Sequence, residues 1–136
     1  MMMKWLMVLA AVMLSSSVMA RDVSELSAPI VLLTPVVGQN ADALALSPQQ
    51  RQVLRDWVNT APAKRMAVED EVVVLRAKLR EAIYQGSPQA ERESLAQRIG
   101  ELETRLLMIR SQCVEHWRSH LSAEQFAKAV ALAKQR

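Results

Sequence analysis

The chain has few of the residues that build disulfides or phosphate-binding loops. Its 136 residues include one cysteine, three glycines, two histidines and 4% aromatic residues. A single thiol cannot form an internal disulfide, so Cys113 has three uses left: an intermolecular bridge, a metal ligand or a buried apolar side chain. The sequence has neither a glycine-rich phosphate loop nor a serine in a nucleophile elbow, and we expect no enzymatic activity.

The first twenty residues are typical of a cleavable secretory signal. Lys4 gives a positive start, residues 5–14 form a short apolar core, and Val18 and Ala20 put small residues at positions −3 and −1. The apolar core is shorter than the roughly 20 residues that cross a bilayer. We predict that residues 1–20 are removed and that the mature chain is periplasmic, with an uncleaved anchor as the alternative.

Charge in the remaining chain is nearly balanced. Without Lys4, the chain has 16 basic and 14 acidic residues. This small positive net charge does not indicate a nucleic-acid-binding protein, in which a clustered basic face is expected. Six of the eight methionines also fall in the signal, which removes an apparent methionine-rich copper protein. Beyond residue 21 no apolar stretch could cross a membrane, and the length fits one domain.

Residues 21–45 contain two prolines and a glycine and show no helical period. We predict an extended N-terminal arm, with a short strand as the alternative. Its apolar segments, Ile30–Leu33 and Val36–Val37, are suited to packing on another element.

A first short helix is predicted from Ser47, because Ser47 and Gln50 have the spacing of a capping box and Pro48 suits the first helical position. Residues 59–62 interrupt its pattern, since the residue before a proline avoids the helical region. The apolar face before this break consists of Val53, Leu54, Trp57 and Val58.

Two long helices are predicted next, from about Pro62 to Gln85 and from Pro88 to about His120. Each carries apolar residues at alternating spacings of four and three. Gly86 ends the first helix and Ser87 caps the second, so the connection is short and the helices are antiparallel neighbours. Gly100 lies inside the second helix, where it allows a close approach or a bend. The seam residues are Val68, Val72, Leu75, Leu79, Ala82, Leu95, Ile99, Leu102, Leu106, Ile109, Cys113, His116 and His120.

A last short helix follows Ser122, which forms a second capping box with Gln125, and Leu121 can pack on Phe126. No strand-like alternation occurs after residue 47. The predicted fold is therefore all-α, a long antiparallel helical hairpin flanked by two short helices. Such a hairpin has a thin core with exposed apolar seams, so we expect a homodimer.

Two segments, one before the hairpin and one after it, share the pattern Leu-Ser/Thr-x-x-Gln. This pair, around a long charged hairpin and behind a secretory signal, resembles the Spy/CpxP family of periplasmic stress proteins. The zinc-responsive ZraP proteins and CnrX-like heavy-metal sensors share that architecture. The resemblance covers residues 46 to about 133, with serine in place of the commoner threonine. The motif residues are Leu46, Ser47, Gln50, Leu121, Ser122 and Gln125.

The resemblance implies a helical hairpin domain over residues 46–136 and three kinds of activity. Spy-like members form cradle-shaped antiparallel dimers that bind unfolded clients without ATP. CpxP-like members also damp an envelope-stress sensor kinase. CnrX-like members bind metal in the helical bundle and signal to a membrane partner.

One local cluster could hold a metal. Cys113, His116 and His120 recur at three- and four-residue spacing on one side of a helix. Thiolate and imidazole suit zinc, nickel, cobalt or copper. In the alternative interpretation, a straight helix drifts from the seam, so that Val114, Trp117 and Leu121 become buried and the histidines turn to solvent.

Charged residues of both signs alternate along the hairpin. They form either a solvated face with ion pairs one helical turn apart, or a surface where arginine stems and apolar patches hold unfolded clients. Three hypotheses follow: an ATP-independent chaperone or envelope-stress modulator, a metal-binding sensor or resistance protein, and an adaptor that binds a membrane partner through residues 30–37.

Overall fold

The computed structural model describes residues 23–136, and this part of the chain contains four helices and no strand. They are α1 (Thr34–Gln39), α2 (Pro48–Gln85), α3 (Gln89–His120) and α4 (Ala123–Ala133). The predicted signal sequence lies outside the described residues. Within them, no helix is apolar enough over a sufficient length to cross a membrane.

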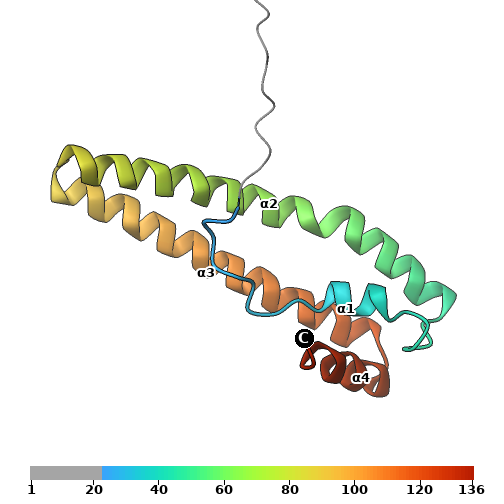
Figure 1. The fold of residues 1–136 in the computed structure, drawn as a ribbon. Helices are drawn as coiled ribbons and strands as arrows, with labels where there is room; N and C mark the ends of the chain where they lie inside the picture. Colours follow the sequence, from blue (N-terminus) through green and yellow to red (C-terminus); the bar gives the residue numbers. More distant parts are fainter. Residues whose placement is uncertain (1–22) are drawn as a thin grey trace, which may run out of the picture.

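The hairpin is formed by α2 and α3, which lie antiparallel (Figure 1). Gly86 ends α2 in the left-handed region at a φ of 67°, where a residue without Cβ has no steric cost. The N-cap of α3 is Pro88 and no side chain caps this end, so the predicted capping by Ser87 is wrong. The all-α helical hairpin is confirmed, but the short helix predicted from Ser47 is the first part of α2.

Apolar seam residues of both long helices meet in what we call the hairpin core. The four-three spacing predicted this contact, because it places successive apolar residues on one face of each helix. The buried members are Val68, Val72, Ile99 and Leu102, with Leu75, Leu79, Leu106 and Ile109 packed around them.

The predicted break near Pro62 is absent, since α2 is continuous from Pro48 to Gln85 with Pro62 inside it. Proline removes one helical hydrogen bond, here the one to the carbonyl of Val58. This turn is on the outside of the hairpin: Val58 is 46% exposed. Water can therefore satisfy the freed carbonyl, and the helix bows gently instead of ending (Figure 1).

The first short helix is α1, within the segment that we expected to be extended. Pro35 lies in its first turn, and Val36 and Val37 are buried. Residues 23–33, which precede α1, are non-helical, and we call them the arm. The arm crosses the hairpin and runs along α3 (Figure 1).

Where α2 and α3 separate, away from Gly86, α1 lies in the gap and α4 folds back beneath it (Figure 1). Their shared apolar cluster, the junction core, is built around Trp117, which is completely buried. Its other buried members are Leu33, Val36, Val37, Leu44, Leu46, Leu121 and Ala129.

Candidate functional site where the helices converge

The hydroxyl of Thr34 is the polar centre of the junction core. Its Oγ1 accepts hydrogen bonds from the indole nitrogens of Trp57, at 3.2 Å, and Trp117, at 2.9 Å. Cys113 Sγ lies 3.0 Å from the same oxygen. A hydroxyl has two lone pairs and one hydrogen, and indole can only donate. The hydroxyl hydrogen therefore points to the sulfur. The thiol that the sequence predicted as a metal ligand is thus already hydrogen-bonded to a residue of α1.

His116 lies between aromatic rings. Its imidazole stacks on Trp57 with ring centroids 3.6 Å apart, and its centroid is 4.5 Å from that of His120. The Nε2 atom is buried and has no hydrogen-bond partner among the described residues. Burial first, and then the neighbouring His120, lowers the pKa of His116 below its usual value of about 6.5. The ring is therefore neutral at neutral pH.

The structure brings two of the three predicted metal-ligating residues together. His116 and His120 are adjacent, whereas Cys113 contacts Thr34. Among residues 23–136, no group of three or more His, Cys, Asp or Glu side chains is arranged to hold a metal ion. The helical drift accounts for part of this arrangement, because Trp117 and Leu121 are buried and His120 is exposed, but His116 is half-buried against Trp57 and does not face solvent.

The two sequence motifs meet in space. Both predicted capping boxes are present, with Ser47 and Ser122 as N-caps. The two motif glutamines also bond to each other: Gln50 Nε2 donates to Gln125 Oε1 at 2.8 Å, and Gln125 Nε2 donates to Gln50 Oε1 at 3.0 Å. Gln50 further donates to the carbonyl of His120, at the end of α3. This reciprocal amide pair joins the start of α2 to the start of α4.

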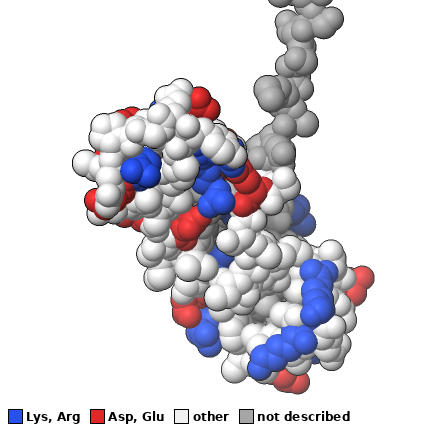
Figure 2. Space-filling model, turned by 60° about the vertical axis from the view of Figure 1, so that its left-hand side comes forward, with Lys and Arg blue, Asp and Glu red and all other residues white. Residues whose placement is uncertain are grey.

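Ion pairs along the hairpin link the two helices as well as successive turns of one helix. Arg98 bonds to Glu71 across the hairpin at 3.0 Å and to Glu101 one turn along at 3.2 Å. Arg80 pairs with Glu25, which ties the arm to α2. Basic and acidic side chains are intermixed over this surface (Figure 2). Much of the charge alternation is therefore accounted for by pairing.

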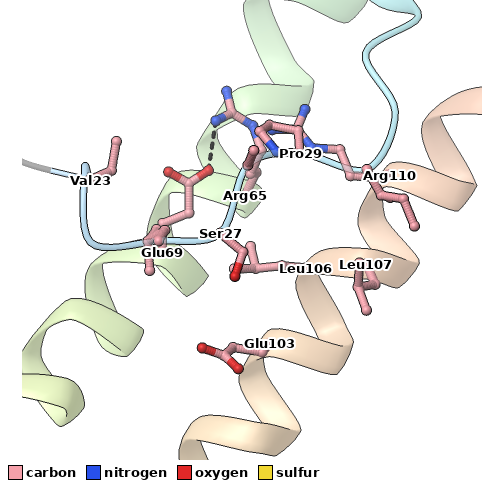
Figure 3. A pocket seen from close by; sticks show the side chains of 12 residues that line it. Val23, Ser27, Pro29, Arg65, Glu69, Glu103, Leu106, Leu107 and Arg110 are labelled. Atoms are coloured by element: carbon pink, nitrogen blue, oxygen red, sulfur yellow. Dashed lines mark hydrogen bonds and ion pairs between the residues drawn. The ribbon is translucent and has the colours of Figure 1, made fainter.

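Several hollows flank the arm, and two of them share a pair of arginines. The first, of about 330 Å³, lies under residues 23–30, and Arg65 and Glu69 of α2 and Arg110 of α3 face it (Figure 3). The second, of about 590 Å³, lies beside the start of α1 and also reaches Arg65 and Arg110. Neither of these hollows was predictable from the sequence, because the arm has no periodicity that would place it.

The role of Thr34 was not predictable from the sequence either. A single threonine in a segment without a pattern carries no signal, and its two tryptophan partners lie 23 and 83 residues away. Comparison with protein-family models, curated proteins and solved structures found no match to this chain.

Proposed function

We propose that this chain is a periplasmic, ATP-independent chaperone or envelope-stress modulator of Spy/CpxP type. The observation that carries the proposal is how much apolar surface stays uncovered. In the described residues, eleven apolar side chains larger than alanine are buried, while ten others are at least 38% exposed. The exposed ones are Ile30, Val31, Leu32, Val58, Met66, Val74, Ile83, Tyr84, Leu107 and Met108.

The exposed apolar residues suit weak binding to many chains. They are spread along the arm and the elongated hairpin, where arginines separate them; arginine stems add apolar contact while their heads attract acidic groups. A surface of this kind shields the apolar segments of an unfolded protein without demanding one sequence. It needs no nucleotide, because release follows when the client folds and buries those segments.

The proposed partners are unfolded envelope proteins and a second copy of this chain. Uncovered apolar seams of this extent favour association, and a dimer would form the cradle that the resemblance implies. Damping of a membrane sensor would use the same exposed surface. Sedimentation of the mature protein would report the association directly.

The test is dilution of a chemically unfolded reporter enzyme into ATP-free buffer while its light scattering is followed. We expect the mature protein to suppress aggregation, and a Leu107→Ser/Met108→Ser variant to lose much of this effect, since both side chains are at least half exposed. Gln97→Ala, an exposed change on the same helix, is the matched control. Equal suppression by the parent and the double variant would remove the role of this apolar surface.

A second candidate function is metal sensing or resistance, and the adjacent rings of His116 and His120 favour it. Zinc, nickel, cobalt or copper would be bound by the two imidazoles and by the thiolate of Cys113, once the hydrogen bond between Cys113 and Thr34 is broken. Calorimetric titration of the reduced protein, beside a Cys113→Ser/His116→Ala/His120→Ala variant, separates the two functions. The chaperone proposal expects client protection to survive this triple change, whereas metal sensing expects tight binding that the change abolishes.

A further inference from the structure

The hollow beside the start of α1 is lined by three cations and no carboxylate. Lys64, Arg65 and Arg110 all reach it, and none of its lining residues is Asp or Glu. The rest of the wall is mainly apolar and includes Trp57. A concave, apolar wall with a few charged groups of one sign is typical of a binding site for an amphiphilic anion.

Arg110 has no acceptor in the described part of the chain: it makes no hydrogen bond and no ion pair there. Its neighbour Arg65 donates to Glu69 Oε1 at 2.7 Å, so this carboxylate is already used. The two arginines extend toward each other beneath Pro29 (Figure 3). Burial, and then repulsion from Arg65, lowers the pKa of the Arg110 guanidinium, which remains charged. An anion placed here would supply the missing acceptor and offset the repulsion.

The two hollows share Arg65 and Arg110, so they meet at the arginine pair on either side of the arm. The first hollow adds Leu26, Leu106 and Leu107 as apolar wall, and its two carboxylates, Glu69 and Glu103, are paired with Arg65 and Arg76. Together they provide apolar surface on both sides of a central positive charge. This arrangement fits an extended chain whose acidic group lies between apolar side chains better than a compact molecule.

We propose that these hollows form one groove that binds an extended peptide segment in which a carboxylate adjoins apolar side chains. The planar guanidinium of Arg110 presents parallel N–H donors to the carboxylate, and Lys64 adds a second cation at the rim. The inference rests on the proposed chaperone function and adds a client preference to it. Among the segments of unfolded clients, those that are both acidic and apolar bind this groove most tightly.

The experiment is fluorescence anisotropy with two short labelled peptides, one alternating leucine with glutamate and one alternating leucine with glutamine. We expect the glutamate peptide to bind the mature protein more tightly. A Lys64→Met/Arg110→Met variant, which keeps the apolar stems, should bind it about tenfold more weakly or worse, because charge-assisted hydrogen bonds to the carboxylate are lost. Arg105→Met, an exposed change on the same helix, should leave the affinity unchanged. Circular dichroism checks that each variant folds.

Equal affinity for the two peptides, or an unchanged affinity in the double variant, would overturn the proposal. Decanoate that binds at Arg110 while the glutamate peptide does not would overturn it in favour of a small carboxylate amphiphile. The aggregation assay separates this inference from the function on which it rests. Protection of clients without charge-dependent peptide binding would sink the inference alone. Peptide binding at Arg110 without any client protection would support the groove and remove the chaperone function.

Discussion

At the scale of single residues, the hydroxyl of Thr34 joins three elements. Through one oxygen it contacts Trp57 of α2 and both Trp117 and Cys113 of α3. Buried indole N–H groups lose free energy when they have no acceptor. The position of α1 in the junction core therefore depends on this one polar group as well as on apolar packing.

Replacement of Thr34 by valine tests that dependence. Valine keeps the shape but leaves two indole donors without an acceptor, so we expect a loss of about 2 to 4 kcal/mol in the free energy of unfolding. Thr34→Ser is the control, because it keeps the hydroxyl and removes one methyl group, worth about 1 kcal/mol. The two are compared by urea denaturation. A serine variant that is no more stable than the valine variant would show that packing dominates.

His116 makes the stability of the fold depend on pH. Its pKa is lowered in the folded state, first by burial and then by His120, so the unfolded chain binds a proton at a higher pH than the folded chain does. The contribution of the neutral ring is complete above a pH of about 6.5. It is lost as the pH falls from there through the folded-state pKa.

The prediction is a smaller drop in melting temperature between neutral and mildly acidic pH in His116→Gln than in the parent protein. Other groups titrate in the same window, so the quantity that matters is the difference between the two pH profiles. His120→Gln should reduce the drop less, because burial is the larger cause of the shift. Parallel profiles for the parent and His116→Gln would contradict this assignment.

At the scale of the helix, Gly100 in α3 has no structural need to be glycine. The expected close approach is absent, since a Cβ built at this position meets no atom within 4 Å. Alanine has the better helix propensity, so we expect Gly100→Ala to raise the free energy of unfolding by about 1 kcal/mol. Denaturation in urea measures the change. Gly86→Ala is the contrasting variant and should destabilise the protein, because Gly86 has a φ of 67°.

Helices with a long apolar period were predictable from the sequence, and short ones without a period were not. The four-three spacing located α3 and its contact with α2, because it repeats over many turns. Helix α1 has six residues, too few to show a period, and its apolar side chains are buried only because the hairpin opens around them. The helix break predicted at Pro62 was wrong for a related reason. The local preference of proline favours a break, but the helical turns on both sides of it pack on the rest of the fold.

The candidate site was predictable in parts and not in its arrangement. Capping-box spacing identified Gln50 and Gln125 separately, because a cap is a local feature. Their mutual hydrogen bonds span 75 residues, and no local pattern reports that distance. The same limit applies to Cys113: its spacing to His116 suggested a shared metal, whereas its contact with Thr34 depends on where α1 packs.

At the scale of the whole molecule, the glutamine pair closes the end of the bundle where α2 and α3 are not joined by a turn. Gly86 connects α2 and α3 at one end; at the other, Gln50 and Gln125 join the start of α2 to α4, and Gln125 Nε2 also donates to the carbonyl of Leu44 at 3.1 Å. The segment before α2, the end of α3 and the start of α4 thus converge on two side chains. Opening of this end would separate the elements that surround the junction core.

A double-mutant cycle tests whether the two glutamines act as one unit. Each change to alanine removes a capping box and the mutual bonds, so we expect each to cost about 1 to 3 kcal/mol in the free energy of unfolding. The double variant should lose less than the two single losses together, by about 1 kcal/mol, because the shared bonds can be lost only once. Gln50→Ala combined with the remote Gln97→Ala should be additive. If Gln50→Ala and Gln125→Ala are additive as well, each glutamine only caps its own helix, and the closure of this end rests on the apolar junction core.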